Sequence, residues 1–464
     1  MNKKYILILI VFVLCLACGG NSNDEDIHIP EEDTEEPEVP VEEPETPAIS
    51  EEELLTLVQE ETFAYFWDYA EVNSGAARER YLPNEPERDQ HVVTTGGTGF
   101  GLMALLVGIE RGFISRAEGV ERISSILTFL EEADRFHGAW PHWLNGSTGA
   151  VIPFSEKDDG GDLVETAFLV QGLICIKEYF NGSSATEQQL ANLADELWKG
   201  VEFNWYTNNT EVLYWHWSPN YNFDMNLSLK GYNEVLVTYV LAAASNNFSI
   251  DKEVYNNGWA SNGDIVSSKI TYGLPLVVKH AGAEDYGGPL FWAHYSFLGL
   301  NPNGLVDAYA NYENVVVNHT KINYQYCVEN PKNYQDYGAN CWGLTASYTM
   351  GTDGGLGYSA HSPTNDRGVI SPTAAISSIP YTPEESMAAM YYFYQHRSDV
   401  LGPAGFYDAF SPSYNWVAPA YLAIDQGPQI IMIENYRTGL LWRLFMQNEE
   451  VQAGLNKLGF SYEM

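Results

Sequence analysis

The chain has 464 residues, 45% of them hydrophobic, with 12 Trp, 31 Tyr and 20 Phe, which supports a large buried core and excludes a disordered protein. Its formal net charge of −39 argues against binding to a phosphate backbone or an anionic bilayer, so neither nucleic acid nor a membrane surface is an expected partner. A neutral substrate is favoured.

The chain begins MNKKYILILIVFVLCLAC, with a lysine pair, a short apolar run and small residues ahead of Cys18. The apolar run is short for a membrane-spanning helix, so residues 1–17 are predicted to be a secretion signal, with an uncleaved signal anchor as the alternative. The segment resembles a bacterial lipoprotein signal, although Cys15 stands where Leu is more usual. This resemblance predicts lipidation at Cys18 and a protein of the cell envelope, held to the outer membrane by lipid alone.

Residues 18–50 are rich in acids, Pro, Ser and Thr and contain no Lys or Arg. Such a segment buries too little apolar surface to fold, and its like charges repel, so it is predicted to be an extended tether. Acids soon after Cys18 also resemble the surface-export signals of Bacteroidetes lipoproteins. Residues 51–464 show no linker-like break and are predicted to form one catalytic domain.

From residue 51 onward the pattern is mainly helical. Three amphipathic stretches come first, at 51–70, 99–111 and 116–136. Further helical runs are expected to begin near Asp162, Thr186, Asn233, Pro289, Trp342, Pro372, Pro383 and Pro428. Helices chained in this way predict an all-α fold, the (α/α)6 barrel or toroid, and residues 140–154 and 205–217 are predicted to form β-hairpins or long loops on the active-site rim.

Several other motifs are set aside. Gly97, Gly99 and Gly101 in TTGGTGFGLM follow no strand and lack the final spacing of a dinucleotide-binding loop. The sequence has no HExxH and no GxSxG, and its three cysteines beyond the signal form no CxxC and no zinc-like spacing with His, so neither a metal nor another cofactor is expected. A disulfide between Cys327 and Cys341 is left open, since the body contains an odd number of cysteines.

The stretch HGAWPHWLNGSTGAVIPFSEKDDGGDLVETAFLVQG, residues 137–172, combines aromatic and acidic side chains ahead of an apolar helical run. Its acids are Asp158, Asp159, Asp162 and Glu165. A glycoside hydrolase needs two carboxyl groups beside the scissile bond and flat rings for the sugar faces, so this stretch suggests a sugar site. Asp162 and Glu165 also have the spacing of a capping box, and helix capping is an equally good reading of the segment alone.

Two other acids stand at predicted helix starts. Glu234 lies in GYNEVL, where Asn233 is expected to cap the following helix, and Asp425 lies in AIDQGP, just ahead of Pro428. The inner helices of an α/α barrel are parallel, so their N-terminal ends, with these acids, are expected to converge on one rim. Helix starts favour acids without any catalytic role, and this structural reading stays open for each of them.

The chemistry of a general acid distinguishes the two residues. It requires a raised pKa, whereas helix N-termini lower the pKa of a carboxyl group, so burial and like-charge crowding must dominate. Glu234, which follows Tyr232, is expected to be this acid, and Asp425, beside a helix start and Gln426, is expected to stay ionised as the base.

Sugar-binding side chains are expected among rings that lie in loops. The residues predicted to bind substrate are Trp140, His142, Trp143, Trp217, Tyr232, Tyr407, Trp416, Tyr421 and Gln426. Arg78 and Arg80 are expected to form scaffold ion pairs, with donation to sugar hydroxyls as the alternative.

Long phrases of the chain carry a family resemblance. VVTTGGTGFGLMALLVGIERGFI, FSEKDDGGDLVETAFLVQG, GYNEVL and DAFSPSYNWVAPAYLAIDQGPQIIMIENYRTGLLW resemble the bacterial glucoamylase-like family that contains the endo-β-1,2-glucanases, family 144 of the glycoside hydrolases. The resemblance runs from about residue 52 to the C-terminus. It implies an (α/α)6 barrel and metal-free, inverting hydrolysis of linear β-1,2-glucan to sophorose and other short oligosaccharides.

The resemblance also implies roles for the acids. It places the family's acidic trio on Asp158, Asp162 and Glu165, its further essential glutamate on Glu234 and its late aspartate on Asp425. By analogy, Glu234 is the general acid, Asp425 is the general base, and the trio shapes the pocket, with a share in proton relay as a further option. Separately, the protein is expected to be a monomer. The alternatives are an exo-acting, sophorose-releasing enzyme, a hydrolase of another β-glucan, and a glycan-binding surface lipoprotein without catalysis.

Overall fold

The structure is a computed structural model that describes residues 49–464 except 183, 281–284, 353 and 463–464. The predicted signal, Cys18 and residues 19–48 of the tether lie outside the described residues. Within the described part of the chain, no helix has both the length and the hydropathy that crossing a bilayer requires.

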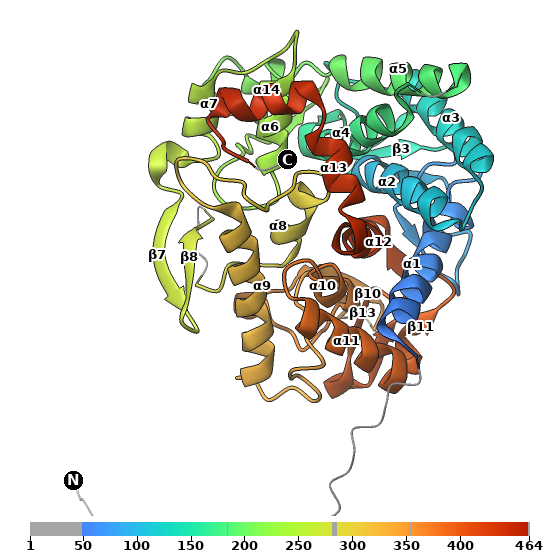
Figure 1. Ribbon diagram of the computed structural model, residues 1–464, viewed down its shortest axis with the longest axis vertical. Coiled ribbons are helices and arrows are strands. Elements are labelled where there is room, and N and C mark those ends of the chain that lie inside the picture. Colours follow the sequence, from blue (N-terminus) through green and yellow to red (C-terminus); the bar gives the residue numbers. More distant parts are fainter. Residues whose placement is uncertain (1–48, 183, 281–284, 353, 463–464) are drawn as a thin grey trace, which may run out of the picture. The chain divides into compact units, whose positions relative to one another are not determined.

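The helices of the described residues form two concentric rings (Figure 1). The inner ring consists of α2 (Thr95–Arg111), α4 (Leu163–Phe180), α6 (Leu236–Ala244), α8 (Phe291–His294), α10 (Pro372–Ile376) and α12 (Ala423–Thr438). The outer ring consists of α1 (Glu51–Trp67), α3 (Arg116–Glu132), α5 (Ala185–Lys199), α7 (Lys252–Asn257), α9 (Tyr312–Glu329), α11 (Pro383–His396) and α14 (Glu449–Leu458), and α13 (Leu440–Met446) joins α12 to α14. This is the predicted (α/α)6 barrel.

The two rings differ in burial for a reason that is visible in the sequence. Every residue of α4 from Leu163 to Ile176 is buried, and so is every residue of α2 from Thr95 to Gly108. Helix α3, by contrast, buries only a stripe of five residues, as an amphipathic surface helix does. Helices that are apolar on all sides therefore line the barrel, and amphipathic helices cover it.

Glycines let α2 and α4 pack at very short range. A Cβ atom on Gly99 would lie 2.3 Å from the Phe168 carbonyl oxygen, and one on Gly172 would lie 2.4 Å from the carbonyl oxygen of Gly99. Gly97 and Gly101 are also inside α2, with close neighbours from α12 and α1. A strand, Val92–Thr94, does precede these glycines, which corrects the sequence prediction on that point, but they lie inside α2, serve helix packing and form no nucleotide-binding loop.

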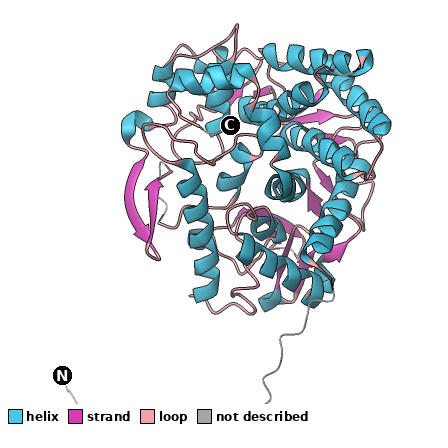
Figure 2. Ribbon diagram, in the orientation of Figure 1, coloured by secondary structure: helices cyan, strands magenta, loops and turns pink. Residues whose placement is uncertain are grey.

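The strands are short and occur as small antiparallel sheets (Figure 2). The pairs are β1 (Arg80–Tyr81) with β15 (Tyr421–Leu422), β2 (Val92–Thr94) with β3 (Trp143–Asn145), β3 with β4 (Val151–Ile152), β5 (Gly161–Asp162) with β6 (His216–Trp217), β7 (Val266–Thr271) with β8 (Leu274–Val278), β9 (Ala346–Met350) with β10 (Leu356–Ala360), β11 (Leu401–Gly402) with β12 (Gly405–Phe406), and β13 (Ala409–Ser411) with β14 (Trp416–Ala418). Strands β2, β5 and β15 run directly into the inner helices α2, α4 and α12. Each of these helix N-termini is therefore held by a strand pair.

Three details differ from the sequence predictions. The run expected near Trp342 is the hairpin β9–β10, whereas α9 was not predicted, because its Val, Thr, Asn and Tyr residues are weak helix formers. Pro428 is the sixth residue of α12 rather than its first. Cys327 and Cys341 are both buried free thiols, so the optional disulfide is absent.

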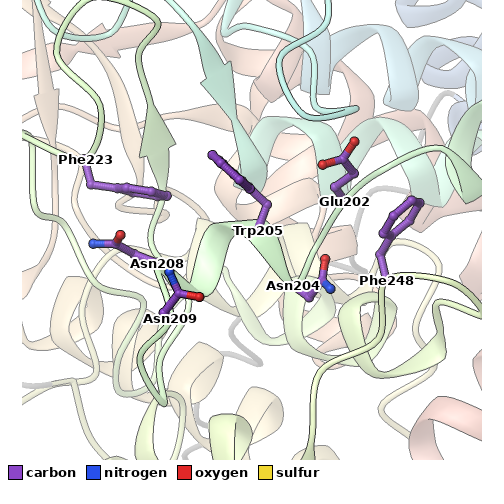
Figure 3. Close-up of a pocket in the computed structure, with 7 residues that line it drawn as sticks. All are labelled: Glu202, Asn204, Trp205, Asn208, Asn209, Phe223 and Phe248. Carbon is purple, nitrogen blue, oxygen red and sulfur yellow. The ribbon is translucent and has the colours of Figure 1, made fainter.

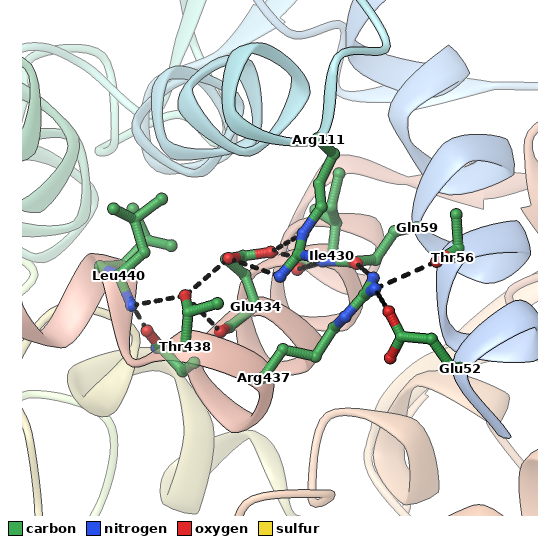
Figure 4. A network of polar contacts seen from close by, with 11 residues as sticks. Glu52, Thr56, Gln59, Arg111, Ile430, Glu434, Arg437, Thr438 and Leu440 are labelled. Atoms are coloured by element: carbon green, nitrogen blue, oxygen red, sulfur yellow. Dashed lines mark hydrogen bonds and ion pairs between the residues drawn. The ribbon is translucent and has the colours of Figure 1, made fainter.

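A polar network joins the C-terminal ends of α2 and α12 to the N-terminal half of α1 (Figure 4). Arg111 donates to both carboxylate oxygens of the buried Glu434, at 2.7 and 2.9 Å. Gln59 donates to the same carboxylate and accepts a bond from Arg437, which also pairs with Glu52. The bidentate geometry and the several donors satisfy a carboxylate that would otherwise be costly to bury.

Candidate active site

Asp162 both caps a helix and contributes to the candidate site, the two roles that the sequence left open. It is the N-cap of α4, where its Oδ1 accepts the N–H groups of Val164 at 3.0 Å and Glu165 at 2.9 Å. Its Oδ2 instead faces two histidines, His142 Nδ1 at 3.0 Å and His216 Nε2 at 3.7 Å. Helix capping therefore uses one oxygen and leaves the other for the site.

The titratable groups around Asp162 differ in the direction of their pKa shifts. Burial alone lowers the pKa of His142, but the charge of Glu165 and the hydrogen bond to Asp162 raise it to about 10, which makes His142 a cation. Burial raises the pKa of Asp162, but the bond from His142 and the nearby His216 bring it below its usual value. Burial, with the charge of Asp162, raises the pKa of Asp158 and that of Glu165 to about 7. One ionised carboxylate thus lies between two that bind protons near neutral pH.

Glu165 also contacts the start of α2. Its Oε2 accepts the N–H of Gly96 at 2.8 Å, and a Cβ atom on Gly96 would lie 2.5 Å from that oxygen. The contact depends on glycine at this position, and it brings the N-termini of two inner helices together around one carboxyl group.

Glu234 lies in the turn just ahead of α6, not in the first turn of that helix as predicted. Asn233 Oδ1 accepts the N–H of Val235 at 3.1 Å, which fixes this turn. Burial raises the pKa of Glu234 to about 7, with a further contribution from the charge of Asp162. Burial thus outweighs the nearby helix N-terminus, which would lower the pKa of this carboxyl group.

Asp425 is in the first turn of α12 and forms a carboxyl pair with Asp408. Both are buried, and apart from their mutual contact, Asp408 Oδ1 and Asp425 Oδ2 meet no donor among the described residues. Burial and the charge of Asp408 hold the pKa of Asp425 well above its usual value. Burial raises the pKa of Asp408 only to about 6, because the hydrogen bond with Asp425 and then the Tyr348 N–H, which donates to its Oδ2 at 2.6 Å, oppose the rise. The raised pKa values favour one proton held between the two carboxyl groups, which differs from the expectation that Asp425 stays ionised as the base.

Two cavities adjoin the acids. The first, about 320 Å³, is lined by Glu165, Trp143 and Phe154 and by Tyr348 and Tyr358 of the β9–β10 hairpin; we call it the Glu165 cavity. The second, about 380 Å³, is lined by Glu234 together with Trp215, Asn233 and Trp292; we call it the Glu234 cavity. Aromatic walls beside carboxyl groups suit the apolar faces and the hydroxyl groups of a sugar.

Tyr295, at the start of a 3₁₀ turn (Tyr295–Phe297), lies near acids that line both cavities. Its side chain is buried, and its hydroxyl has no hydrogen-bond partner among the described residues. Burial, followed by the charges of Asp425, Glu165 and Glu234, raises its pKa well above the usual value. One hydroxyl therefore lies within electrostatic reach of acids from α12, α4 and the turn before α6, so these acids belong to one site.

The predicted sugar-binding residues separate into two groups. His142 and Trp143 line the Glu165 cavity, while Trp217, Tyr407 and Trp416 are half-buried. The side chains of the other four are buried and hydrogen-bonded inside the protein: Trp140 to Leu130, Tyr232 to His319, Tyr421 to Gly405 and Gln426 to Phe406. These four are core residues, which corrects the prediction for them.

Sequence reasoning missed Asp408, Tyr295, His216, Tyr348 and Tyr358. Asp408 is 17 positions before Asp425, outside any helix, and no local spacing links the two. The other four come from short strands and a 3₁₀ turn that tertiary packing alone brings to the acids. His216 had one available signal, since it neighbours Trp217 in a predicted hairpin.

The carboxyl pair leads to a pH-dependent prediction. In Asp408→Asn the amide oxygen still accepts the Tyr348 N–H and the amide nitrogen donates to Asp425, so the geometry is kept while one charge is lost. Without the neighbouring charge, the pKa of Asp425 falls. We expect the acid limb of kcat/KM, near pH 6 in the parent, to move to lower pH while the alkaline limb stays in place. Hydrolysis measured from pH 4 to 9 tests this, and an unmoved acid limb would rule out a shared proton.

The fold and the site together define the class. An (α/α)6 barrel whose inner-helix N-termini collect paired carboxyl groups beside aromatic cavities has the equipment of a glycoside hydrolase. Comparison with known proteins agrees. The Glycoamylase family model, which describes glucoamylases, matches residues 226–449. The endo-β-1,2-glucanase of Chitinophaga pinensis, solved with sophorotriose and glucose, is 56% identical, with a TM-score of 0.86 over 89% of this chain and 99% of that one.

A second relative is an exo-β-1,2-glucooligosaccharide sophorohydrolase of Parabacteroides distasonis, 45% identical over 433 residues and 88% of this chain. The present chain spans 58% of that enzyme's length. An endo-β-1,2-glucanase of Talaromyces funiculosus, 11% identical over 88% of this chain and 91% of its own, shares the fold with a TM-score of 0.63. The chain belongs to the glucoamylase-like family that contains the bacterial β-1,2-glucanases, which confirms the resemblance found in the sequence.

Proposed function

We propose that this protein hydrolyses linear β-1,2-glucan within the chain, with inversion at the anomeric carbon. The observation that carries the proposal is the presence of two cavities, one beside Glu165 and one beside Glu234, because an endo-acting enzyme must hold sugar units on both sides of the bond it cleaves. The match to the Chitinophaga pinensis endo-glucanase over nearly the whole of both chains supports the same mode.

Glu234 acts as the general acid and donates its proton to the glycosidic oxygen, since its pKa of about 7 leaves it protonated in mildly acidic solution. The Asp408–Asp425 pair carries one negative charge above about pH 6 and accepts a proton from the attacking water. The C1–O bond to water forms on one face as the glycosidic C1–O bond breaks on the other, so the anomer inverts without a covalent intermediate.

The remaining groups position the sugar. His142 is a cation on the wall of the Glu165 cavity and supplies a charged donor to sugar hydroxyls, while Tyr295 supplies an unpartnered hydroxyl near Glu165, Glu234 and Asp425. Asp162 holds His142 in place, and Asp158 and Glu165 exchange protons in the range where the enzyme works.

The test is a time course of products from long linear β-1,2-glucan. An endo-acting enzyme yields a ladder of oligosaccharides from the earliest times, with new reducing ends that carry the inverted anomer by NMR. Sophorose alone from the earliest times would replace the endo mode with the exo mode that the 45% identical relative favours. Products that keep the β-configuration would contradict the inverting mechanism. Hydrolysis of another β-glucan, but not of β-1,2-glucan, would contradict the proposed substrate.

The protein is further proposed to be a monomer held at the cell envelope by a lipid on Cys18. Metabolic labelling with a fatty acid is expected to mark the parent but not Cys18→Ala. Labelling of both would contradict lipidation at Cys18, and light scattering of residues 51–464 measures the oligomeric state.

A further inference from the structure

An exposed indole lies outside the acid site, in the loop between α5 and β6. Trp205, in the 3₁₀ turn Trp205–Thr207, is 43% exposed, although it belongs to the residue type with the largest apolar surface. One of its faces stacks on His137, with ring centroids 3.7 Å apart and planes 13° apart. His137 is in turn held by Glu202 through Nδ1 and Oε2 at 3.2 Å. The indole is therefore fixed in orientation and is not a loose side chain.

A cavity of about 340 Å³ adjoins this indole (Figure 3). It is lined by Glu202, three asparagines at 204, 208 and 209, and the rings of Trp205, Phe223 and Phe248. The three amide side chains make no hydrogen bond to other residues in the described part of the chain, so they remain available to a ligand. No lining residue is basic, which disfavours an anionic ligand.

Two of these asparagines have a backbone conformation that favours Asn. Asn208 and Asn209 both have left-handed conformations, with φ of 50° and 57°, which side chains other than Asn and Asp rarely adopt. The turn that holds them closes on Trp205, whose carbonyl accepts the N–H of Asn208 at 3.0 Å. A rigid ring next to uncommitted amides suits a neutral sugar, whose C–H face stacks on the indole while its hydroxyls bond to the amides.

This surface lies next to the acid site. Trp205 packs edge-on against Trp217, with centroids 6.3 Å apart, and Trp217 belongs to β6. Its neighbour in that strand, His216, approaches Asp158 and Asp162 at 3.4 and 3.7 Å. One strand pair thus separates the Trp205 surface from the acids, a short span for a polysaccharide.

We propose that Trp205, Asn208 and Asn209 form an additional glycan-binding platform, which holds part of the polysaccharide outside the acid site. The identity of the ligand, β-1,2-glucan, rests on the proposed function. A second attachment raises the effective concentration of the chain at the site, and only chains long enough to reach both places benefit.

The experiment compares Trp205→Ala and the double variant Asn208→Gly/Asn209→Gly with the parent. Glycine keeps the left-handed backbone, so the double variant removes the amides without disturbing the turn. For long β-1,2-glucan we expect kcat/KM to fall about three- to tenfold, mainly through KM, the effect of losing one aromatic contact. For the shortest oligosaccharide that the enzyme hydrolyses we expect no change. An equal fall on both substrates, or no fall on the long one, overturns the platform.

A binding measurement separates this proposal from the proposed function. In affinity electrophoresis through gels containing β-1,2-glucan, the parent is expected to be retarded and both variants to be retarded less. If the parent binds but does not hydrolyse the glucan, the proposed function fails while reduced retardation of the variants still supports the platform. If the parent hydrolyses the glucan and the variants are retarded as strongly as the parent, the platform fails alone.

Discussion

Replacing Glu234 with glutamine is expected to reduce kcat on β-1,2-glucan by about a thousandfold, the typical contribution of a general acid being about 10²- to 10⁴-fold. Glutamine keeps the shape of the side chain but has no proton to give to the leaving oxygen. KM is expected to change little, because the cavity walls remain. Initial rates from reducing-end production measure both constants. The matched control is Glu156→Gln, which removes an exposed carboxyl group of the loop before α4 and should leave kcat unchanged.

Glu234→Gln is also expected to change the free energy of unfolding, in a direction that follows from the raised pKa of Glu234. The pKa of Glu234 is about 7 in the folded protein and near 4.5 when exposed, so ionisation costs folding stability as pH rises through this interval. At pH 8 Glu234→Gln is therefore expected to be more stable than the parent by up to about 3 kcal/mol, with little difference at pH 5. Chemical unfolding at the two pH values measures this. Equal stability at pH 8 would show that the carboxyl group is not desolvated, and would weaken its assignment as the acid.

Replacing Asp425 with asparagine is expected to produce a loss of similar size, about a thousandfold in kcat, by removing the oxygen that accepts a proton from water. Asp408 remains, but the Tyr348 N–H occupies one of its oxygens and lowers its pKa, which makes Asp408 a weaker base. Azide added as a small external nucleophile is expected to rescue Asp425→Asn, since azide needs no deprotonation, and not Glu234→Gln.

The pattern of rescue decides between the two roles. The product of the rescued reaction is a glycosyl azide with the anomeric configuration opposite to that of the glucan. If azide restores Glu234→Gln in place of Asp425→Asn, the roles of acid and base are exchanged. If Asp425→Asn retains more than about a tenth of the parent kcat without azide, the base lies elsewhere.

The sequence predicted the fold better than the site. Inner helices such as α4 are apolar on all sides, and outer helices such as α3 are amphipathic. In both cases the local sequence pattern predicts which residues are buried. Asp162, Glu165 and Asp425 were found because acids at helix starts follow a local rule. Asp408 and Tyr295 follow none, since a loop and a 3₁₀ turn reach the acids only through packing of the whole barrel.

The roles of the acids were hard to predict for the same reason, because they depend on contacts between residues far apart in the sequence. Asp425 looked like an isolated acid at a helix start, where the dipole lowers a pKa, but the partner 17 residues earlier reverses the direction. Trp140 and Tyr421 looked like sugar platforms, because the composition of a loop does not reveal which rings turn inward. Burial of a particular ring is a tertiary property, and short irregular segments carry no period from which to read it.

Tyr348 couples two properties that an engineer would prefer to change separately. Its ring lines the Glu165 cavity, and its backbone N–H lowers the pKa of Asp408 in the Asp408–Asp425 pair. A replacement that shifts β9 to admit a different sugar will therefore also retune the pH optimum. Trp143 and Phe154 line the same cavity and have no bond to the pair in the described residues, so selectivity is better redesigned from their side.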